Sequence, residues 1–292
     1  MTTFLQIVVN GLGKGAVYAL LALGFVVIFK ATEVVNFAHG SLALLGGYVV
    51  FATRPTLGWA GAAAVGVLSA GIAALVVERL MLSRAKLASA DSLALLTIGV
   101  DIVVTEEIVR RLGTRIPFLG DPYDAKPLHA GDVTIFRTQF VALVVSALLL
   151  TGFFLAFRYS AWGLAMRAQA ENREAAALMG IRSWRVTASA WLVAGVLAGV
   201  AVLFLATQDF SGSGLSRDTH SLALAAFPAA ILGGLDATSG AVVGGLVVGL
   251  AEALSAQYIS FDFAKSAVFI VMLVVLVARP SGLFGTRERQ RV

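Results

Sequence analysis

The stretch RYSAWGLAMRAQAENREAAALMGIRSWRV, residues 158–186, lies between two long apolar runs at 139–157 and 187–208. It contains the arginines Arg158, Arg167, Arg173, Arg182 and Arg185. Arginine concentrates in the cytoplasmic loops of membrane proteins. The flanking runs have about the length that a bilayer-crossing helix needs, roughly 20 residues. The stretch is therefore predicted to be a cytoplasmic loop that joins two membrane-spanning helices.

The composition of the whole chain agrees with a membrane protein. Of its 292 residues, 59% are hydrophobic and 13% are charged, whereas a soluble domain is about half apolar and roughly a quarter charged. Long apolar runs predict helices rather than barrel strands, because barrel strands alternate over about ten residues. We expect an all-α, polytopic membrane protein of about eight to nine transmembrane or re-entrant helices.

The apolar segments are distributed over the whole chain. They are 4–29, 37–53, 60–80, 92–112, 139–157, 187–208, 221–235, 239–258 and 264–279. Segments 37–53 and 221–235 are short and contain glycine, which favours re-entrant or tilted pieces. No soluble module is long enough to fold by itself. Residues 1–292 are therefore expected to form a single transmembrane domain, with the loop 158–186 as a part of it.

Lysine and arginine near the segment ends predict the orientation. The loop 78–90, the loop 158–186 and the tail from Arg279 are basic, and an even number of spans separates each from the next. All three can then face the cytoplasm, with the N-terminus outside and the C-terminus inside. The loops 113–138 and 209–220 are expected outside, where the prolines of the first favour a small external cap.

Several function classes are disfavoured. The net charge of +5 is explained by arginines on one side of a membrane, so no nucleic-acid partner is expected. Cysteine is absent and the three histidines form no ligand-spaced cluster, so neither a disulfide nor a metal site is expected. The patterns H-E-x-x-H, G-x-S-x-G and G-x-x-x-x-G-K-[ST] do not occur. No catalytic residue is assigned, and the chain is not expected to be an enzyme.

A short helix is predicted inside the basic loop, from about Asn172 to Met179. Asn172 is a favourable N-cap residue, and Gly180 is a favourable residue to end a helix. Glu174 lies in the first turn, where negative charge suits the helix dipole.

The apolar residues of this helix lie on one face. Ala175, Leu178 and Met179 are spaced to form a small apolar knob, which needs a cover if it faces the cytoplasm. A helix lying on lipid headgroups is the alternative. The consecutive alanines favour contact with protein instead.

The loop carries a recognisable pattern. Glu174-Ala175-Ala176 is followed four residues later by Gly180, which resembles the EAA-type loop of ABC importer permeases, whose short coupling helix docks on the ATPase subunit. Other segments are similar to the inner-membrane permeases of branched-chain amino-acid ABC importers, and most to the first of the two paired permeases. They are Asn10-Gly11, Tyr18-Ala19-Leu20, Val35-Asn36-Phe37-Ala38-His39-Gly40, Arg158-Tyr159-Ser160, Met179-Gly180-Ile181, Ala230-Ile231-Leu232-Gly233-Gly234, Gly249-Leu250-Ala251-Glu252-Ala253-Leu254 and Arg279-Pro280-Ser281-Gly282-Leu283-Phe284-Gly285. The loop 113–138 shows no such similarity.

The resemblance implies a division of labour in an importer of the bacterial inner membrane. A periplasmic solute-binding protein captures the amino acid, and this chain and a second homologous permease form the path through the lipid. Two cytoplasmic ATPase subunits bind ATP and Mg, so ATP hydrolysis is expected on a separate chain and no cofactor on this one. Segment 171–181 would couple the ATPases to the membrane helices. The residues assigned to this contact are Arg173, Glu174, Ala175, Ala176, Leu178, Met179 and Gly180.

Polar residues at the starts of two apolar segments are candidates for the translocation path. Asn36, His39 and Ser41 begin one segment, and Asp236 and Ser239 begin another. Exposed N–H groups at helix N-termini attract carboxylates, as an amino-acid substrate would require. The alternative, which we favour, is that these residues cap helices at the cytoplasmic face and that His39 is a hydrogen-bonded structural histidine.

Two acidic residues are predicted inside spans, where charge is costly and indicates function. Glu252 agrees with the family resemblance, whereas Asp101 departs from it. Lys14 is the nearest obvious cation, although the sequence does not identify its partner. For both acidic residues a structural ion pair or a subunit contact is the alternative to a substrate contact.

Three other functions stay open. The same machinery can carry urea, short amides or aromatic acids. An ion-coupled secondary transporter can use Asp101 or Glu252 as a proton site. A membrane scaffold can use the basic loop to recruit a cytoplasmic protein without transport.

Overall fold

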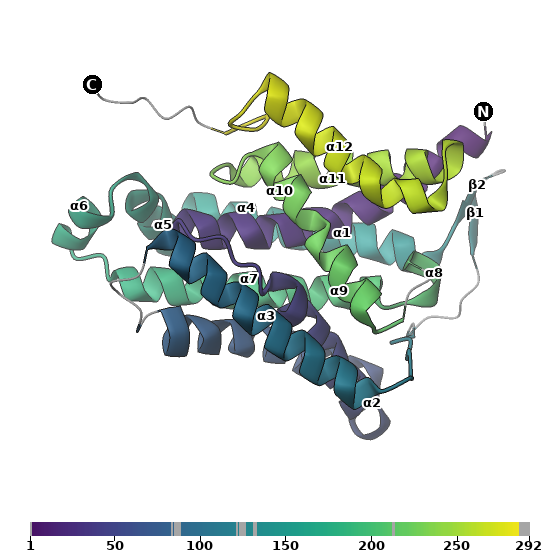
Figure 1. The fold of residues 1–292 in the computed structure, drawn as a ribbon, viewed down its shortest axis with the longest axis horizontal. Helices are drawn as coiled ribbons and strands as arrows, with labels where there is room; N and C mark the ends of the chain where they lie inside the picture. Colours follow the sequence, from purple (N-terminus) through teal and green to yellow (C-terminus); the bar gives the residue numbers. More distant parts are fainter. Residues whose placement is uncertain are drawn as a thin grey trace.

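The computed structural model describes residues 2–82, 84, 89–120, 122, 127–130, 133–211 and 214–285, most of them helical (Figure 1). In chain order the elements are α1 (Thr2–Thr32), α2 (His39–Val77), the π-helical turn η1 (Glu78–Leu82), α3 (Ala90–Leu112), β1 (Leu128–Ala130), β2 (Val133–Ile135), α4 (Arg137–Tyr159), α5 (Ala161–Glu171), α6 (Arg173–Leu178), α7 (Ser183–Leu205), α8 (Gln208–Ser211), α9 (Arg217–Leu224), α10 (Ala226–Gly233), α11 (Thr238–Tyr258) and α12 (Phe261–Ala278). The bundle is helical, as expected.

One small β-hairpin is added to the helical bundle. Strands β1 and β2 pair antiparallel, with Leu128 opposite Ile135 and Ala130 opposite Val133. The hairpin lies in the 113–138 loop, for which the sequence predicted a cap without assigning strands. The expected all-α class is therefore correct for the bundle and incomplete for this loop.

Helix α1 is the centre of the bundle. It contacts α4, α7, α10 and α11, and residues 15–28 are buried without interruption. A helix that is apolar on all sides fits such a position. The contact with α11 is close, because a Cβ at Gly249 would lie 2.3 Å from the backbone nitrogen of Gly15. Small residues of this kind let two helix backbones approach each other.

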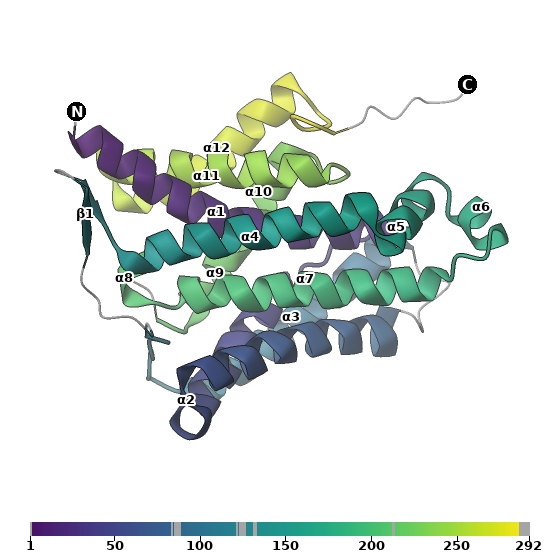
Figure 2. The same ribbon diagram turned by 180° about the vertical axis from the view of Figure 1, so that it is seen from behind.

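Helix α2 consists of two antiparallel arms, 39–57 and 59–77. Gly58 separates them with non-helical angles, φ +67° and ψ 179°, and the turn lies near the α2 label in Figure 2. The arms meet at two glycines, since a Cβ at Gly66 would lie 2.6 Å from the carbonyl oxygen of Gly46. The separate segments predicted at 37–53 and 60–80 correspond to these arms.

The segment predicted at 221–235 is also broken. Helix α9 ends at Leu224 and α10 begins at Ala226, with Ala225 between them. Pro228 lies in the first turn of α10, where its missing N–H removes no helical hydrogen bond. The short helix α10 ends at Gly233 and is followed by Gly234, which has a φ of +106°.

Different elements form the two ends of the molecule. The hairpin β1–β2 and the start of α1 lie at one end, and α6 lies at the other (Figure 1). The backbone N–H of Thr134 in the hairpin donates to the Oε1 of Gln6 at 2.7 Å. At the α6 end, the Arg79 guanidinium lies 4.4 Å from the ring centre of Trp184, which brings the end of α2 to the start of α7.

Five helical segments among the described residues are long and apolar enough to cross a membrane. They are Phe4–Thr32, His39–Leu80, Arg137–Tyr159, Ser183–Leu205 and Thr238–Tyr258, and Phe263–Ala278 is a shorter apolar helix. One of the five, His39–Leu80, contains both arms of α2. These lengths and compositions agree with a polytopic membrane protein.

Candidate functional site

Helix α6 projects from one end of the bundle (Figure 2). It covers Arg173–Leu178, slightly shorter than the predicted Asn172–Met179. The Oδ1 of Asn172 accepts a hydrogen bond from the Ala175 N–H at 2.9 Å. The predicted N-cap is therefore confirmed.

The other end of α6 is closed by Gly180, also as predicted. The N–H of Gly180 donates to the Ala177 carbonyl and the N–H of Ile181 donates to the Ala176 carbonyl, both at 3.0 Å. This pair of bonds is the Schellman arrangement, which needs a left-handed residue at the position of Gly180. Its φ is +85°, a value that costs other L-residues about 1–2 kcal/mol.

The apolar face of α6 points away from the molecule. Leu178 is 89% exposed and Met179 is 84% exposed, and Ala175 is exposed as well. Ala176 is the residue of this helix that is buried. Two large apolar side chains so fully exposed at one tip favour a contact with another protein or with lipid.

The charged residues of α6 are unpaired within the described part of the chain. Arg173 and Glu174 are exposed, and neither forms an ion pair with a described side chain. Their charges are therefore free to meet groups on another molecule.

Helix α5 connects α6 to the central helix. The Nε2 of Gln169 donates to the carbonyl oxygen of Ala31 at 2.8 Å, close to the end of α1. Gln169 is 4% exposed, so this hydrogen bond is shielded from water and holds α5 against α1.

The polar residues predicted at the start of α2 are inside the molecule. Asn36, His39 and Ser41 are all fully buried. Asn36 accepts a hydrogen bond from the Ala38 N–H at 3.1 Å, and Ser41 donates to the Ala38 carbonyl at 2.9 Å. The three residues thus lie at the start of α2, where the sequence placed them, and they are inside the bundle. That they cap this helix at the cytoplasmic face stays a prediction.

His39 lies in an aromatic environment. Its ring centre is 4.6 Å from that of Phe25, which in turn lies 5.4 Å from Phe227 on α10. The Leu21 carbonyl is near the ring, but neither ring nitrogen makes a hydrogen bond of normal geometry with a described residue. His39 is therefore a buried residue of the bundle, and its role as a hydrogen-bonded structural histidine stays a prediction.

Asp101 has a partner that the sequence analysis missed. Both of its carboxylate oxygens lie 3.0 Å from the Nε2 of His220 on α9. His220 is also next to Gly40, where a Cβ would lie 2.9 Å from the Cδ2 of the ring. This contact joins α3, α9 and the start of α2.

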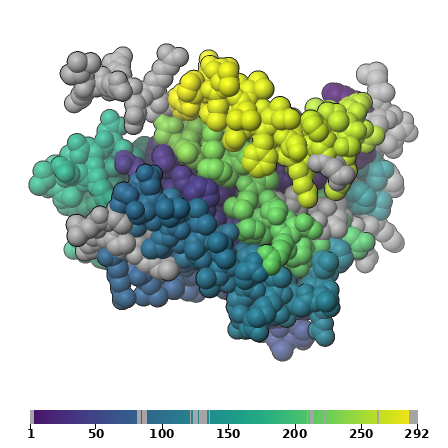
Figure 3. Space-filling view, in the orientation of Figure 1, coloured from purple at the N-terminus to yellow at the C-terminus, as the bar shows by residue number. Residues whose placement is uncertain are grey.

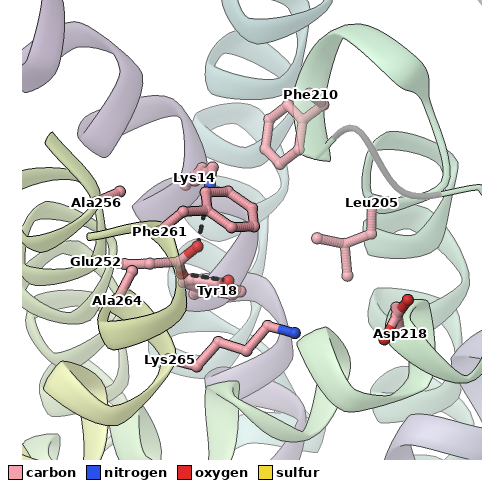
Figure 4. Close-up of a pocket in the computed structure, with 10 residues that line it drawn as sticks. All are labelled: Lys14, Tyr18, Leu205, Phe210, Asp218, Glu252, Ala256, Phe261, Ala264 and Lys265. Atoms are coloured by element: carbon pink, nitrogen blue, oxygen red, sulfur yellow. Dashed lines mark hydrogen bonds and ion pairs between the residues drawn. The ribbon is translucent and has the colours of Figure 1, made fainter.

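Glu252 is held by two residues of α1 (Figure 4). The Nζ of Lys14 lies 3.0 Å from its Oε1, and the Tyr18 hydroxyl donates to its Oε2 at 2.6 Å. The side chains of Lys14 and Glu252 are 21% and 10% exposed. Glu252 therefore lies inside the bundle with both carboxylate oxygens engaged. The three residues line a cavity of about 130 Å³.

The residues predicted at the start of α11 lie elsewhere. Asp236 lines a cleft of about 840 Å³ at the α6 end, together with Lys30, Glu33, Arg167 and Glu171. Ser239 is exposed and does not line this cleft. The structure thus separates these two residues from the buried group formed by Asn36 and His39.

The amino-acid sequence matches, over residues 7–278, the family described as the permease component of the branched-chain amino acid transport system. The chain belongs to this family. Membership agrees with the helices that are long and apolar enough to cross a membrane. The expected location, as a multi-pass protein of the bacterial inner membrane, is confirmed by the similarity to the permeases LivH and BraD described next.

Named relatives of this permease cover nearly all of it. It is 30% identical to the high-affinity branched-chain amino acid transport system permease protein LivH of Escherichia coli, over 99% of this chain and 98% of the relative. It is 29% identical to the permease protein BraD of Pseudomonas aeruginosa, with the same coverage. A probable LivH permease of Methanocaldococcus jannaschii is 30% identical over 91% of this chain and 88% of the relative.

A solved structure also resembles this permease. The structure of PsaBC from Streptococcus pneumoniae in complex with a Fab matches with a TM-score of 0.49 and 13% sequence identity, over 95% of this chain and 89% of the other. At that distance it assigns no residue of the sites described above.

Proposed function

We propose that this chain is the membrane-spanning permease subunit of an ATP-driven ABC importer for branched-chain amino acids. The observation that carries the proposal is α6, a capped helix with an exposed apolar face at one end of a permease of this family. A helix of this kind suits a docking contact with a cytoplasmic ATPase. Covering Leu178 and Met179 would contribute about 1.5–3 kcal/mol each.

The proposed topology has nine passes with the N-terminus outside and the C-terminus in the cytoplasm. The passes are α1, the two arms of α2, α3, α4, α7, the pair α9–α10, α11 and α12. The positive-inside rule supports this orientation, since Arg79 and Arg185 both lie against Trp184 near α6. Arg279 is the described part of the basic tail, and residues from 286 onward lie outside the described residues.

In the proposed contact, segment 171–181 transmits the movement of the ATPase to the bundle. Arg173 and Glu174 supply free charges, and Ala175, Leu178 and Met179 supply the apolar face. Ala176 holds α6 to its own chain, and Gly180 provides the turn into α7. The hydrogen bond from Gln169 to Ala31 continues the connection to α1.

The complete importer needs further components. We propose a second homologous permease, two ATPase subunits that bind ATP and Mg, and a periplasmic solute-binding protein. This chain supplies the path through the lipid and no cofactor. Asn36, His39, Ser41, Asp101, Asp236, Ser239 and Glu252 remain candidates for lining that path.

The test is affinity purification of the tagged chain in mild detergent, with mass spectrometry of the proteins that accompany it. We expect an ATPase and a second permease to accompany the native chain. Both Glu174→Arg and Leu178→Ser should lose the ATPase, while Ile259→Ser should keep it. Ile259 is a suitable control because it is 63% exposed and lies at the opposite end of α11 from Asp236. A chain that is recovered alone under conditions where other complexes survive contradicts the proposal.

Substrate and energy source are tested by uptake. Unlabelled urea, short amides or aromatic acids that compete with leucine would assign the same machinery to another substrate. Uptake that collapses with an uncoupler while ATP is held constant would assign an ion-coupled transporter. Asp101 is paired with His220 and Glu252 is paired with Lys14, which favours a structural role for both acidic groups.

A further inference from the structure

The cavity next to Glu252 has a second pair of opposite charges. Lys265 on α12 and Asp218 on α9 both line it. In Figure 4 the amine of Lys265 points towards the wall that carries Asp218. Neither residue makes an ion pair with a described side chain. The charges of Lys265 and Asp218 therefore lie on opposite walls of the cavity and do not form an ion pair with each other.

The charges around the cavity are balanced in sign. Lys14 and Lys265 are positive, and Glu252 and Asp218 are negative, so the lining is neutral in total. Both oxygens of Glu252 are engaged by Lys14 and Tyr18. Lys14 donates one hydrogen bond there, whereas an ammonium group has three N–H donors. The groups available to a ligand are thus ammonium donors on one side and the carboxylate of Asp218 on the other.

The remaining lining is apolar. Leu205, Phe210 and Phe261 contribute large apolar side chains, with Ala256 and Ala264 between the charged positions. The volume is about 130 Å³, and a single water needs about 10–15 Å³ of such space. There is room for roughly ten water-sized groups, which matches a small amino acid.

We propose that this cavity binds a free amino acid as a zwitterion. Its carboxylate lies against Lys265 and Lys14, its ammonium lies against Asp218, and its aliphatic side chain lies against the aromatic rings. A net-neutral ligand with separated charges satisfies both unpaired residues and leaves the total charge of the site unchanged. The inference rests on the proposed function and deepens it by assigning a substrate contact within this chain.

The charge arrangement also predicts which ligands are rejected. A carboxylate without an amine leaves Asp218 unpaired, and an amine without a carboxylate leaves Lys265 unpaired. Asp218 and Lys265 are both exposed on this chain, and each analogue makes only one of the two charge-assisted contacts that the amino acid makes. Both kinds of analogue should therefore bind more weakly than the amino acid. 3-Methylbutanoate and 3-methylbutylamine are the matching analogues of leucine.

The test is equilibrium binding of radiolabelled L-leucine to the permease assembly in lipid nanodiscs, without solute-binding protein or ATP. We expect saturable binding, with competition by L-leucine and more than tenfold weaker competition by either analogue. Lys265→Met and Asp218→Asn should each raise Kd at least tenfold. Arg217→Gln is the matched control, because Arg217 is adjacent in sequence but pairs with Glu106 on α3. It should bind leucine as the native chain does.

Three results would overturn the inference. They are native binding by both Lys265→Met and Asp218→Asn, equal competition by 3-methylbutanoate, and no saturable binding to the native assembly. Gel filtration of each variant excludes unfolding as the cause of a loss. If leucine uptake by the native system is normal in any of these cases, the importer stands and the site is rejected. If the native system with all partners transports no leucine, the proposed function itself fails.

Discussion

Both carboxylate oxygens of Asp101 lie 3.0 Å from the Nε2 of His220, across 119 positions of the sequence. The contact fastens α3 to the short helix α9, on the face where α9 and α1 are visible between α3 and α12 (Figure 3). The side chains are 13% and 14% exposed, so the pair is largely shielded from solvent. The contact lies close to the break at Ala225, so it holds α9, the first half of a broken helix, against α3.

We expect Asp101→Asn to leave uptake within about twofold of the native rate, because an amide oxygen can still accept from His220. The loss of charge should lower stability by about 1 kcal/mol, or roughly 2–4 °C in melting temperature. Uptake against external pH, with thermal unfolding in detergent, provides the measurement. A shifted pH profile in the folded variant would instead assign Asp101 to proton coupling.

Removing one partner of the Lys14–Glu252 pair should lower the stability of the fold more than removing both partners. Glu252→Gln leaves the ammonium of Lys14 inside the bundle without its counter-charge, and a loss of about 3 kcal/mol is expected for such a site. Lys14→Met together with Glu252→Gln removes both charges and should recover part of that loss. Thermal unfolding of the three proteins measures the difference. A double variant less stable than Glu252→Gln would show that the pair is not the source of the effect.

Gly249→Ala should destabilise the fold by more than 1 kcal/mol. The new Cβ would lie 2.3 Å from the backbone nitrogen of Gly15, so α1 and α11 would have to separate. Gly152→Ala in α4 is the control, because no atom of the described residues lies within 4 Å of its Cβ position. That variant should be neutral or up to about 1 kcal/mol more stable. Equal melting temperatures for the two variants would contradict the close contact.

Uptake should survive replacement of Gly180, in the turn after α6, by asparagine but not by proline. Gly180→Asn keeps a residue that adopts positive φ readily, so uptake should stay near the native rate. Gly180→Pro removes the N–H that bonds the Ala177 carbonyl and cannot adopt a φ of +85°. It should abolish uptake while the chain remains inserted and folded, as measured by uptake and gel filtration. Native uptake by the proline variant would reject a coupling role for this turn.

Local patterns predicted much of what the structure contains. The bundle follows from long apolar runs, and α6 follows from Asn172 and Gly180, whose capping preferences depend on neighbouring backbone groups. These features need only a few consecutive residues. The break at Gly58 was anticipated in the same way, as a gap between two apolar segments.

Contacts between distant segments could not be predicted. His220 was not considered, because its partner Asp101 is on another helix and a single histidine gives no periodic signal. Lys14 was noted as a cation, but its pairing with Glu252 depends on how closely α1 and α11 approach. The burial of His39 depends on how segment 33–38 packs against neighbouring helices, which apolar composition does not indicate.

The hydrogen bond from Gln169 to Ala31 has a mechanical consequence. Through this bond, α6 is connected to the central helix α1, and α5 lies between them. Lys14 and Tyr18 belong to that same central helix, on the side of Glu252. A displacement applied at α6 can therefore pass through the single residue Asn172 and α5 to a helix that carries part of the cavity wall.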